Sequence, residues 1–347
     1  MNNLRTGRKT GSGVCFQFPR SAVRKTLEKS AGMVYNTKKT EKKMKHISFA
    51  GREVPAIIVG CMRLNAADAA GQRRLISAAV ERGLNFFDHA DIYGRGECET
   101  AFGNAAADLK IPREKLFIQT KCGIVPGKMY DFSEKHIIES VEGSLRRLRT
   151  DYVDSLLLHR PDVLFEPEEV AAAFDKLERE GKVRAFGVSN MAPCQIDLLK
   201  TAVKQPIAAN QLQFSAAHAG MISCNVELNM TTPGAVARDG YVLEYCRLHG
   251  IAVQAWSPFR YGFFEGVFLD DAKYQKLNDV LAEIGTNYGV SKAAVAAAWI
   301  LRHPAKTQVI TGTANPAHLL DIAAGGDILL SREEWYKIYT AAGYMLP

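Results

Sequence analysis

The sequence predicts an α/β fold, a (β/α)8 TIM barrel preceded by a short N-terminal β-hairpin and a basic extension. Eight short, almost wholly apolar runs recur between residues 56 and 311, and polar loops and helical patterns separate them. Buried strands that alternate with helices form parallel sheets with right-handed crossovers. Eight such units match a closed barrel better than an open sheet of five or six strands.

The basic extension covers residues 1–43, and we expect it to have little order. It holds 11 Lys and Arg against two acids, a net of +9, whereas residues 44–347 hold 33 basic and 35 acidic groups, a net of −2. A nearly neutral body lacks the positive surface of a nucleic-acid-binding protein. The extension is interpreted as a disordered arm, as a transit peptide to an organelle, or as sequence upstream of a start at Met44.

Composition also limits location and partners. No apolar run reaches the roughly 20 residues that a membrane span requires. The seven cysteines include no Cys-x-x-Cys pair, and a chain of 347 residues can fold without disulfides, so a reducing compartment is expected. We therefore expect a cytoplasmic protein, a monomer or a weak oligomer, with no nucleic-acid or membrane partner.

The elements of the barrel domain, residues 44–347, follow in order. A hairpin with Gly51 in its turn comes first. Helix starts of the capping-box type occur at Asn65-x-x-Asp68 and at Ser331-x-x-Glu334. The helix that follows the third strand shows Ile137, Val141, Leu145 and Leu148 on one face. The eight predicted strands are residues 56–60, 85–88, 117–121, 153–159, 185–189, 208–213, 252–256 and 308–311.

Two nucleotide-binding folds are excluded because their motifs are missing. An open Rossmann-type sheet requires Gly-x-Gly-x-x-Gly after its first strand, and the nearest match, Gly94-Arg-Gly96-x-x-Glu99, lacks the third glycine. No Gly-x-x-x-x-Gly-Lys-[Ser/Thr] P-loop occurs. The barrel remains the prediction.

Polar side chains lie at the carboxyl ends of the predicted strands, where barrel enzymes carry their active sites. In chain order they are Asp88, Tyr93 in the following loop, Lys121, His159, Ser189, Asn190, Gln211, Trp256 and Ser257. An ammonium beside a phenol lowers the pKa of the phenol, and a neutral imidazole can orient a substrate oxygen. Such a set suits protonation of the alkoxide that forms when hydride reaches a carbonyl. A metal-dependent hydrolase is disfavoured because His89-Ala-Asp91 supplies only one imidazole.

Six short segments carry a family resemblance: Phe87-Asp-His-Ala-Asp-Ile-Tyr-Gly94, Thr120-Lys121, Leu158-His159, Gly187-Val-Ser-Asn190, Asn210-Gln211 and Trp256-Ser-Pro258. Together they resemble the aldo-keto reductase superfamily. The resemblance implies NAD(P)H-dependent reduction of an aldehyde or ketone, without metal or flavin. It makes Tyr93 the proton donor, pairs Lys121 with Asp88 to tune that tyrosine, and lets His159 orient the carbonyl.

The resemblance also implies the cofactor contacts. Ser189, Asn190 and Gln211 would bind the nicotinamide carboxamide, and Trp256 would stack on the nicotinamide. The pyrophosphate would lie against Ser257, Phe259 and Arg260. The adenosine end would lie against Gly312, Thr313, Asn315 and His318. Family members often carry Arg at the position of His318, so the expected preference for NADPH is weakened and NADH remains an alternative.

The sequence leaves two questions open. Loop 212–238 follows a cofactor-contacting strand and is either a wall of the substrate pocket or an insertion. The superfamily also includes auxiliary subunits of potassium channels that bind the cofactor with slow turnover. A cofactor-binding regulatory subunit is therefore the alternative to an enzyme that acts on a small carbonyl compound.

Overall fold

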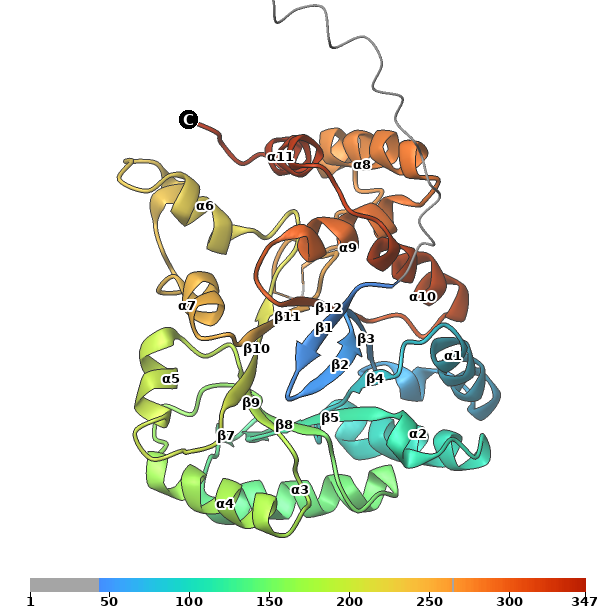
Figure 1. The fold of residues 1–347 in the computed structure, drawn as a ribbon, viewed down its shortest axis with the longest axis vertical. Helices are drawn as coiled ribbons and strands as arrows, with labels where there is room; N and C mark the ends of the chain where they lie inside the picture. The colour runs from blue at the N-terminus through green and yellow to red at the C-terminus, as the bar shows by residue number, and fades with distance from the viewer. Residues whose placement is uncertain (1–43, 264) are drawn as a thin grey trace, which may run out of the picture. The chain divides into compact units, whose positions relative to one another are not determined.

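The computed structural model describes residues 44–263 and 265–347, and these contain a closed barrel of eight parallel strands ringed by helices (Figure 1). The strands follow one another around the barrel in chain order, and the last one pairs with the first. They are β3 (Ile57–Gly60), β4 (Phe86–Asp88), β5 (Phe117–Cys122), β8 (Ser155–Leu158), β9 (Phe186–Ser189), β10 (Ile207–Gln213), β11 (Ala252–Trp256) and β12 (Thr307–Thr311). The predicted (β/α)8 fold is confirmed. The extension predicted over residues 1–43 lies outside the described residues.

The predicted strand runs agree with the observed strands to within two residues at each end. The run 153–159 differs most, because Val153 makes only an isolated bridge to Val183 and His159 already follows the strand. A small antiparallel pair outside the barrel, β6 (Ile124–Val125) and β7 (Met129–Tyr130), was not predicted. Its strands have two residues each, too short for an apolar alternation to be visible in the sequence.

The predicted N-terminal hairpin is present as β1 (His46–Phe49) and β2 (Arg52–Pro55). Ala50 and Gly51 both have positive φ, 48° and 75°, as a two-residue turn of type I′ requires. Phe49 packs edge-on against two phenylalanines at the amino ends of barrel strands, Phe86 and Phe117. The hairpin therefore covers the amino end of the barrel and leaves the carboxyl end, the mouth, to the βα loops (Figure 1).

Most of the described helices bury one face against the barrel or a neighbouring helix, whereas the helix Lys292–Arg302 is buried on all sides. In α3 the buried face includes the four predicted residues Ile137, Val141, Leu145 and Leu148. The described helices are α1 (Ala69–Glu81), α2 (Glu97–Asp108), α3 (Glu134–Leu148), α4 (Pro167–Arg179), α5 (Pro193–Leu199), α6 (Gly220–Val226), α7 (Val242–Leu248), α8 (Gln275–Tyr288), α9 (Lys292–Arg302), α10 (Pro316–Ala323) and α11 (Arg332–Ala341). None of them is long and apolar enough to cross a membrane.

Of the two predicted helix starts, one is confirmed and one is wrong. Ser331 and Glu334 form a reciprocal capping box at the start of α11. In α1 the cap is Asp68, which accepts a hydrogen bond of 2.7 Å from Gly71 N, and Asn65 lies in a preceding 3-10 turn. Asn65 instead donates to Glu97. Aspartate and asparagine are equally good caps, so spacing alone did not distinguish them.

Candidate active site

The barrel brings four predicted catalytic side chains to its mouth. Asp88 is the last residue of β4, Lys121 the penultimate residue of β5, and His159 follows β8 directly. Tyr93 opens the 3-10 turn Tyr93–Gly96, in the loop after β4. Because the strands are parallel and adjacent, their carboxyl ends converge, and the four groups come from three neighbouring βα units.

Lys121 is the centre of this cluster. Its buried ammonium donates to Asp88 Oδ2 at 2.7 Å, to the carbonyl oxygen of His89 at 2.7 Å and to Tyr93 Oη at 3.2 Å. An ammonium has three N–H donors, and all three are used here. The lysine is therefore held in one position, with the phenol oxygen as one of its acceptors.

Burial and charge act in opposite directions on the two groups of this pair. Burial would lower the pKa of Lys121, but Asp88 and Tyr93 outweigh it, and the pKa lies above its ordinary value. For Tyr93, burial raises the pKa and the charge of Lys121 opposes that rise only in part. The sequence predicts a lowered pKa for Tyr93, and the structure corrects this, because burial dominates. The phenol is protonated at neutral pH and can act as a proton donor.

His159 stands edge-on to the phenol, with ring centroids 5.9 Å apart and planes at 82°. Burial, followed by the charges of Lys121 and Arg160, holds the pKa of His159 well below its ordinary value. Its Nδ1 is buried and has no hydrogen-bond partner in the described part of the chain. The imidazole is therefore neutral at neutral pH, and its role in orienting a substrate oxygen through Nε2 stays a prediction.

A row of buried glutamines supports Asp88 from inside the barrel, and sequence reasoning missed it. Gln119 Nε2 donates to Asp88 Oδ1 at 2.7 Å, and Gln211 Nε2 donates to the same oxygen at 3.1 Å. Gln119 and Gln254 also bond to each other, and Gln254 donates to Gln308. The signal was present in the sequence, because Gln119 and Gln254 lie two residues before Lys121 and Trp256 and so face the same side of their strands.

The residues predicted to hold the nicotinamide carboxamide are joined to one another. Asn190 Nδ2 donates to Ser189 Oγ at 2.7 Å, and Trp256 Nε1 donates to Asn190 Oδ1 at 3.1 Å. Ser189 Oγ in turn donates to the carbonyl oxygen of Gln211 at 3.0 Å. Asn190 has a positive φ of 55°, which turns the chain sharply at the end of β9. Three consecutive strand ends thus present their polar groups in one connected set.

The predicted phosphate-binding residues lie in two other loops of the mouth. Ser257 has a positive φ of 50°, and Arg260 N donates to Ser257 O at 3.0 Å, so the segment after β11 turns back at once. After β12, Asn315 caps α10 by accepting from Ala317 N at 2.9 Å. Thr313 bonds to Asn315, while Gly312 and His318 are exposed near the same helix end. An exposed helix N-terminus of this kind favours an anion.

Loop 212–238 is less irregular than predicted, since it contains α6 and a 3-10 turn, Pro233–Ala235. Met221, Ile222 and Cys224 of α6 are buried, and Ala219 N donates to the Tyr344 hydroxyl at 2.6 Å. The segment is therefore attached to the C-terminal residues. Whether it is a wall of the substrate pocket stays a prediction.

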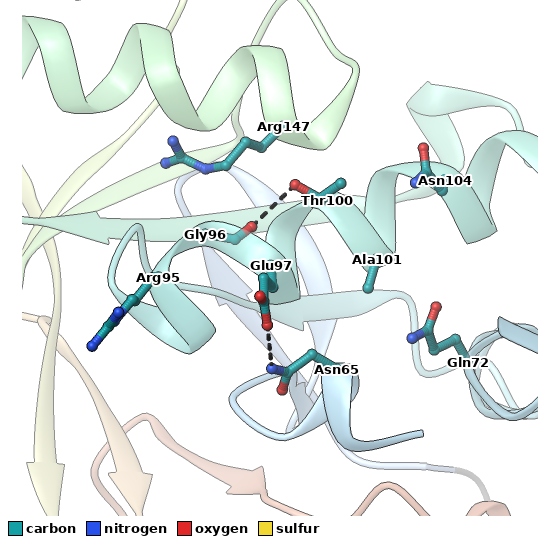
Figure 2. Close-up of a pocket in the computed structure, with 9 residues that line it drawn as sticks. All are labelled: Asn65, Gln72, Arg95, Gly96, Glu97, Thr100, Ala101, Asn104 and Arg147. Atoms are coloured by element: carbon teal, nitrogen blue, oxygen red, sulfur yellow. Dashed lines mark hydrogen bonds between the residues drawn. The ribbon is translucent and has the colours of Figure 1, made fainter. Parts of the chain in front are cut away.

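A separate pocket of about 420 Å³ lies outside the barrel, beside the turn that carries Tyr93 (Figure 2). Its lining comes from α1, α2, α3 and the turns before α1 and α2, with Glu97 accepting from Asn65 at 3.0 Å. None of the predicted catalytic or cofactor residues lines it. Among the described residues no three His, Cys, Asp or Glu side chains are placed to hold a metal ion.

The closed barrel and the Asp–Tyr–Lys–His cluster at its mouth agree with the family resemblance seen in the sequence. The chain belongs to the aldo/keto reductase family, a family of oxidoreductases, whose pattern matches residues 56–342.

Individual relatives agree with this assignment. "Uncharacterized oxidoreductase YcsN" of Bacillus subtilis is 37% identical over 285 residues, which cover 79% of this chain and 89% of that protein. The 6-dehydroglucose reductase of Agrobacterium fabrum is 35% identical, with coverage of 77% and 86%. The structure of an aldo-keto reductase from Klebsiella pneumoniae in complex with NADPH is 27% identical, with a TM-score of 0.69 and coverage of 88% and 96%. A rice protein named probable voltage-gated potassium channel subunit beta is 28% identical, with coverage of 76% and 84%.

Proposed function

We propose that this protein reduces an aldehyde or ketone to the alcohol, with NADPH as the preferred hydride donor. The observation that carries the proposal is the partly buried hydrogen bond between Lys121 Nζ and Tyr93 Oη, with Asp88 as a second acceptor of the same ammonium. Because Tyr93 Oη accepts from Lys121, the phenol proton is free to be donated elsewhere. A tyrosine positioned this way can act as a general acid, because the phenolate that it becomes is stabilised by the neighbouring ammonium.

The residues present fit a nicotinamide dinucleotide. Both hydrogen bonds that the side chain of Gln211 makes use its amide N–H groups, so its side-chain oxygen is the group left for a carboxamide donor. Ser189 and Asn190 lie beside it, and Trp256 is partly exposed next to them. The exposed start of α10 supplies donors for phosphate at the far end. When bound, the reduced nicotinamide supplies the hydride.

The chain's own groups then perform the proton chemistry. His159 donates from Nε2 to the substrate carbonyl oxygen and orients it towards Tyr93. Tyr93 gives its proton to that oxygen as negative charge develops there, and Lys121 stabilises the phenolate that remains. Asp88 keeps Lys121 charged, and the glutamines keep Asp88 in place. The buried position of Lys121 and Asp88 excludes water and strengthens each of these interactions.

The test is turnover of a reactive aromatic aldehyde with NADPH and with NADH, followed by loss of cofactor absorbance. A cofactor-binding regulatory subunit is the second candidate, and the similarity to the rice channel subunit favours it. Reduction of the aldehyde with a turnover of about 1 per second or faster supports the enzyme, because typical enzymes lie in that range. Tight cofactor binding with turnover a thousandfold slower supports the regulatory subunit instead.

We also propose a reducing compartment, the cytoplasm, and a monomer or weak oligomer. The six cysteines in the described part of the chain are all free thiols, and five of them are buried. Free buried thiols are usual where disulfides do not form.

A further inference from the structure

Arg160 is a cation at the mouth that the proposed mechanism does not use. It follows His159 directly, and its side chain is partly buried. Its guanidinium carbon lies 5.5 Å from the ring centre of Trp256 and 5.3 Å from that of Phe263. Arg160 therefore adjoins both the residue proposed to hold the substrate carbonyl and the aromatic proposed to stack on the cofactor.

The charge of Arg160 is not neutralised by a neighbour. Among the described residues Arg160 makes no hydrogen bond and no ion pair, and its contacts are with aromatic rings. Other partly buried arginines of the chain donate to a carboxylate or to a backbone carbonyl. Arg82, Arg113 and Arg147 each pair with an acid, and Arg260 and Arg302, which have no acid partner, donate to the carbonyl oxygens of Glu265 and Leu330. Arg160 thus differs from these arginines, because no acceptor in the described part of the chain binds its guanidinium.

Two acids in the segments beside Arg160 are committed to other groups. Asp162 accepts from Phe132 N at 3.0 Å and from Leu164 N at 2.9 Å. Asp131 accepts from Ser133 N at 2.9 Å. These carboxylates shape the loops by binding backbone N–H groups. The N–H groups of the Arg160 guanidinium are therefore available to a bound ligand.

The cation is also close to the proton donor. Partial burial lowers the pKa of Arg160, and negative charge on Tyr130 or Tyr93 would raise it, so both phenols are within electrostatic reach. A guanidinium offers parallel N–H donors in a planar fork that matches a carboxylate, and partial desolvation strengthens such a pair. The rings of Trp256 and Phe263, which stand at 83° to each other, provide cation–π contacts that favour this position of the guanidinium.

We infer that Arg160 is a specificity-determining residue that selects carbonyl substrates carrying a carboxylate. The guanidinium binds the carboxylate while His159 and Tyr93 hold the carbonyl oxygen. The inference rests on the proposed function, and it names the class of substrate for the same site.

The test compares 4-carboxybenzaldehyde with its methyl ester, which present one carbonyl beside a charged or a neutral group. The unmodified protein is expected to reduce the acid with a kcat/KM at least about tenfold above that for the ester, the scale of a charge-assisted hydrogen bond. Arg160→Met is expected to remove this ratio by raising KM for the acid, with kcat/KM for the ester changed by less than about threefold. Arg160→Lys keeps the charge without the fork and is expected to give an intermediate ratio.

The matched control is Arg179→Met, the same change at the exposed end of α4, the helix that follows Arg160 in the chain. It must leave the ratio unaltered. An unmodified protein that prefers the ester, or an Arg160→Met variant that loses both substrates equally while Arg160→Lys keeps the full ratio, overturns the inference and leaves the proposed function standing. Failure to reduce either aldehyde with either cofactor overturns the proposed function itself.

Discussion

Lys121 donates a 3.2 Å hydrogen bond to the hydroxyl oxygen of Tyr93, a residue 28 positions earlier in the chain. The lysine cannot turn away, because its other two donors are held by Asp88 and by the carbonyl of His89. A phenol that accepts from an ammonium has its own proton free, and the phenolate left behind is stabilised by the same ammonium. This geometry suits a partly buried tyrosine that acts as an acid at neutral pH.

Replacing the lysine tests that coupling. Lys121→Met is expected to lower kcat by about a hundredfold or more, the scale of general acid catalysis. Burial already raises the pKa of Tyr93, and Lys121 opposes the rise, so its loss raises that pKa further. The reaction needs protonated tyrosine, and the alkaline limb of the kcat profile should therefore move to higher pH.

The pH profile of kcat for both proteins measures this shift. The double variant Asp88→Asn with Lys121→Met is the control, because it removes the unpaired buried carboxylate that the single variant leaves behind. It should fold better than Lys121→Met, and its alkaline limb should be displaced less, because the charge of Asp88 itself raises the pKa of Tyr93. An alkaline limb that stays in place in both variants would mean that the lysine does not act on Tyr93.

Two variants in the row of buried glutamines, Gln119→Leu and Gln308→Leu, test whether the row supports Asp88 in catalysis. Gln119→Leu removes a hydrogen bond to Asp88 and leaves other buried polar groups unpaired, which should cost about 2 kcal/mol of unfolding free energy and lower kcat several-fold. Gln308→Leu removes bonds to Gln254 and to the carbonyl of Pro55, at the end of the row away from Asp88. It should cost similar stability without changing kcat. Urea unfolding and kcat of both variants decide, and equal losses of kcat would show a merely structural role.

The extension over residues 1–43 is expected to be dispensable for catalysis. A protein that begins at Met44 keeps the bond from Lys45 N to Gly326 O and the whole β1–β2 hairpin. Its kcat/KM should equal that of the full chain, and its melting temperature should fall within about 2 °C, since no described element is lost. A shortened protein that does not fold, or has lost activity, would show that the extension belongs to the barrel domain.

The preference between the two cofactors should be modest. NADPH is expected to bind more tightly than NADH, but only modestly, because Thr313, Asn315 and His318 lack the permanent charge and the planar fork of an arginine. Dissociation constants for both reduced cofactors measure the preference, and His318→Gln should weaken it further. Equal affinities, or tighter NADH binding, would refute the role of His318.

Features with a local signature could be predicted from the sequence. The barrel strands were visible as apolar runs, Gly51 as the turn residue of the hairpin, and Ser331 with Glu334 as a helix start. Each of these depends on residues within a few positions of one another. The polar strand ends were informative because parallel strands bring their carboxyl ends to one side.

Features that depend on distant contacts could not be predicted. The raised pKa of Tyr93 follows from burial, which only the closed barrel creates. The isolation of Arg160 depends on Asp162 binding the backbone of Phe132, in a loop 30 residues earlier. Asn65 was mistaken for a helix cap because Asp68 competes with it locally, and its contact with Glu97 is also distant. Contacts between residues so far apart in the chain leave no periodic pattern in the sequence.

Tyr93 is proposed as the proton donor, and the turnover of Tyr93→Phe tests this role most directly. The change removes one hydroxyl and keeps the ring against His159, so the fold and the cofactor dissociation constant should stay close to those of the unmodified protein. Turnover of an aromatic aldehyde under saturating cofactor should fall by at least about a hundredfold. Turnover within a few-fold of the unmodified protein, with cofactor binding intact, would contradict the account.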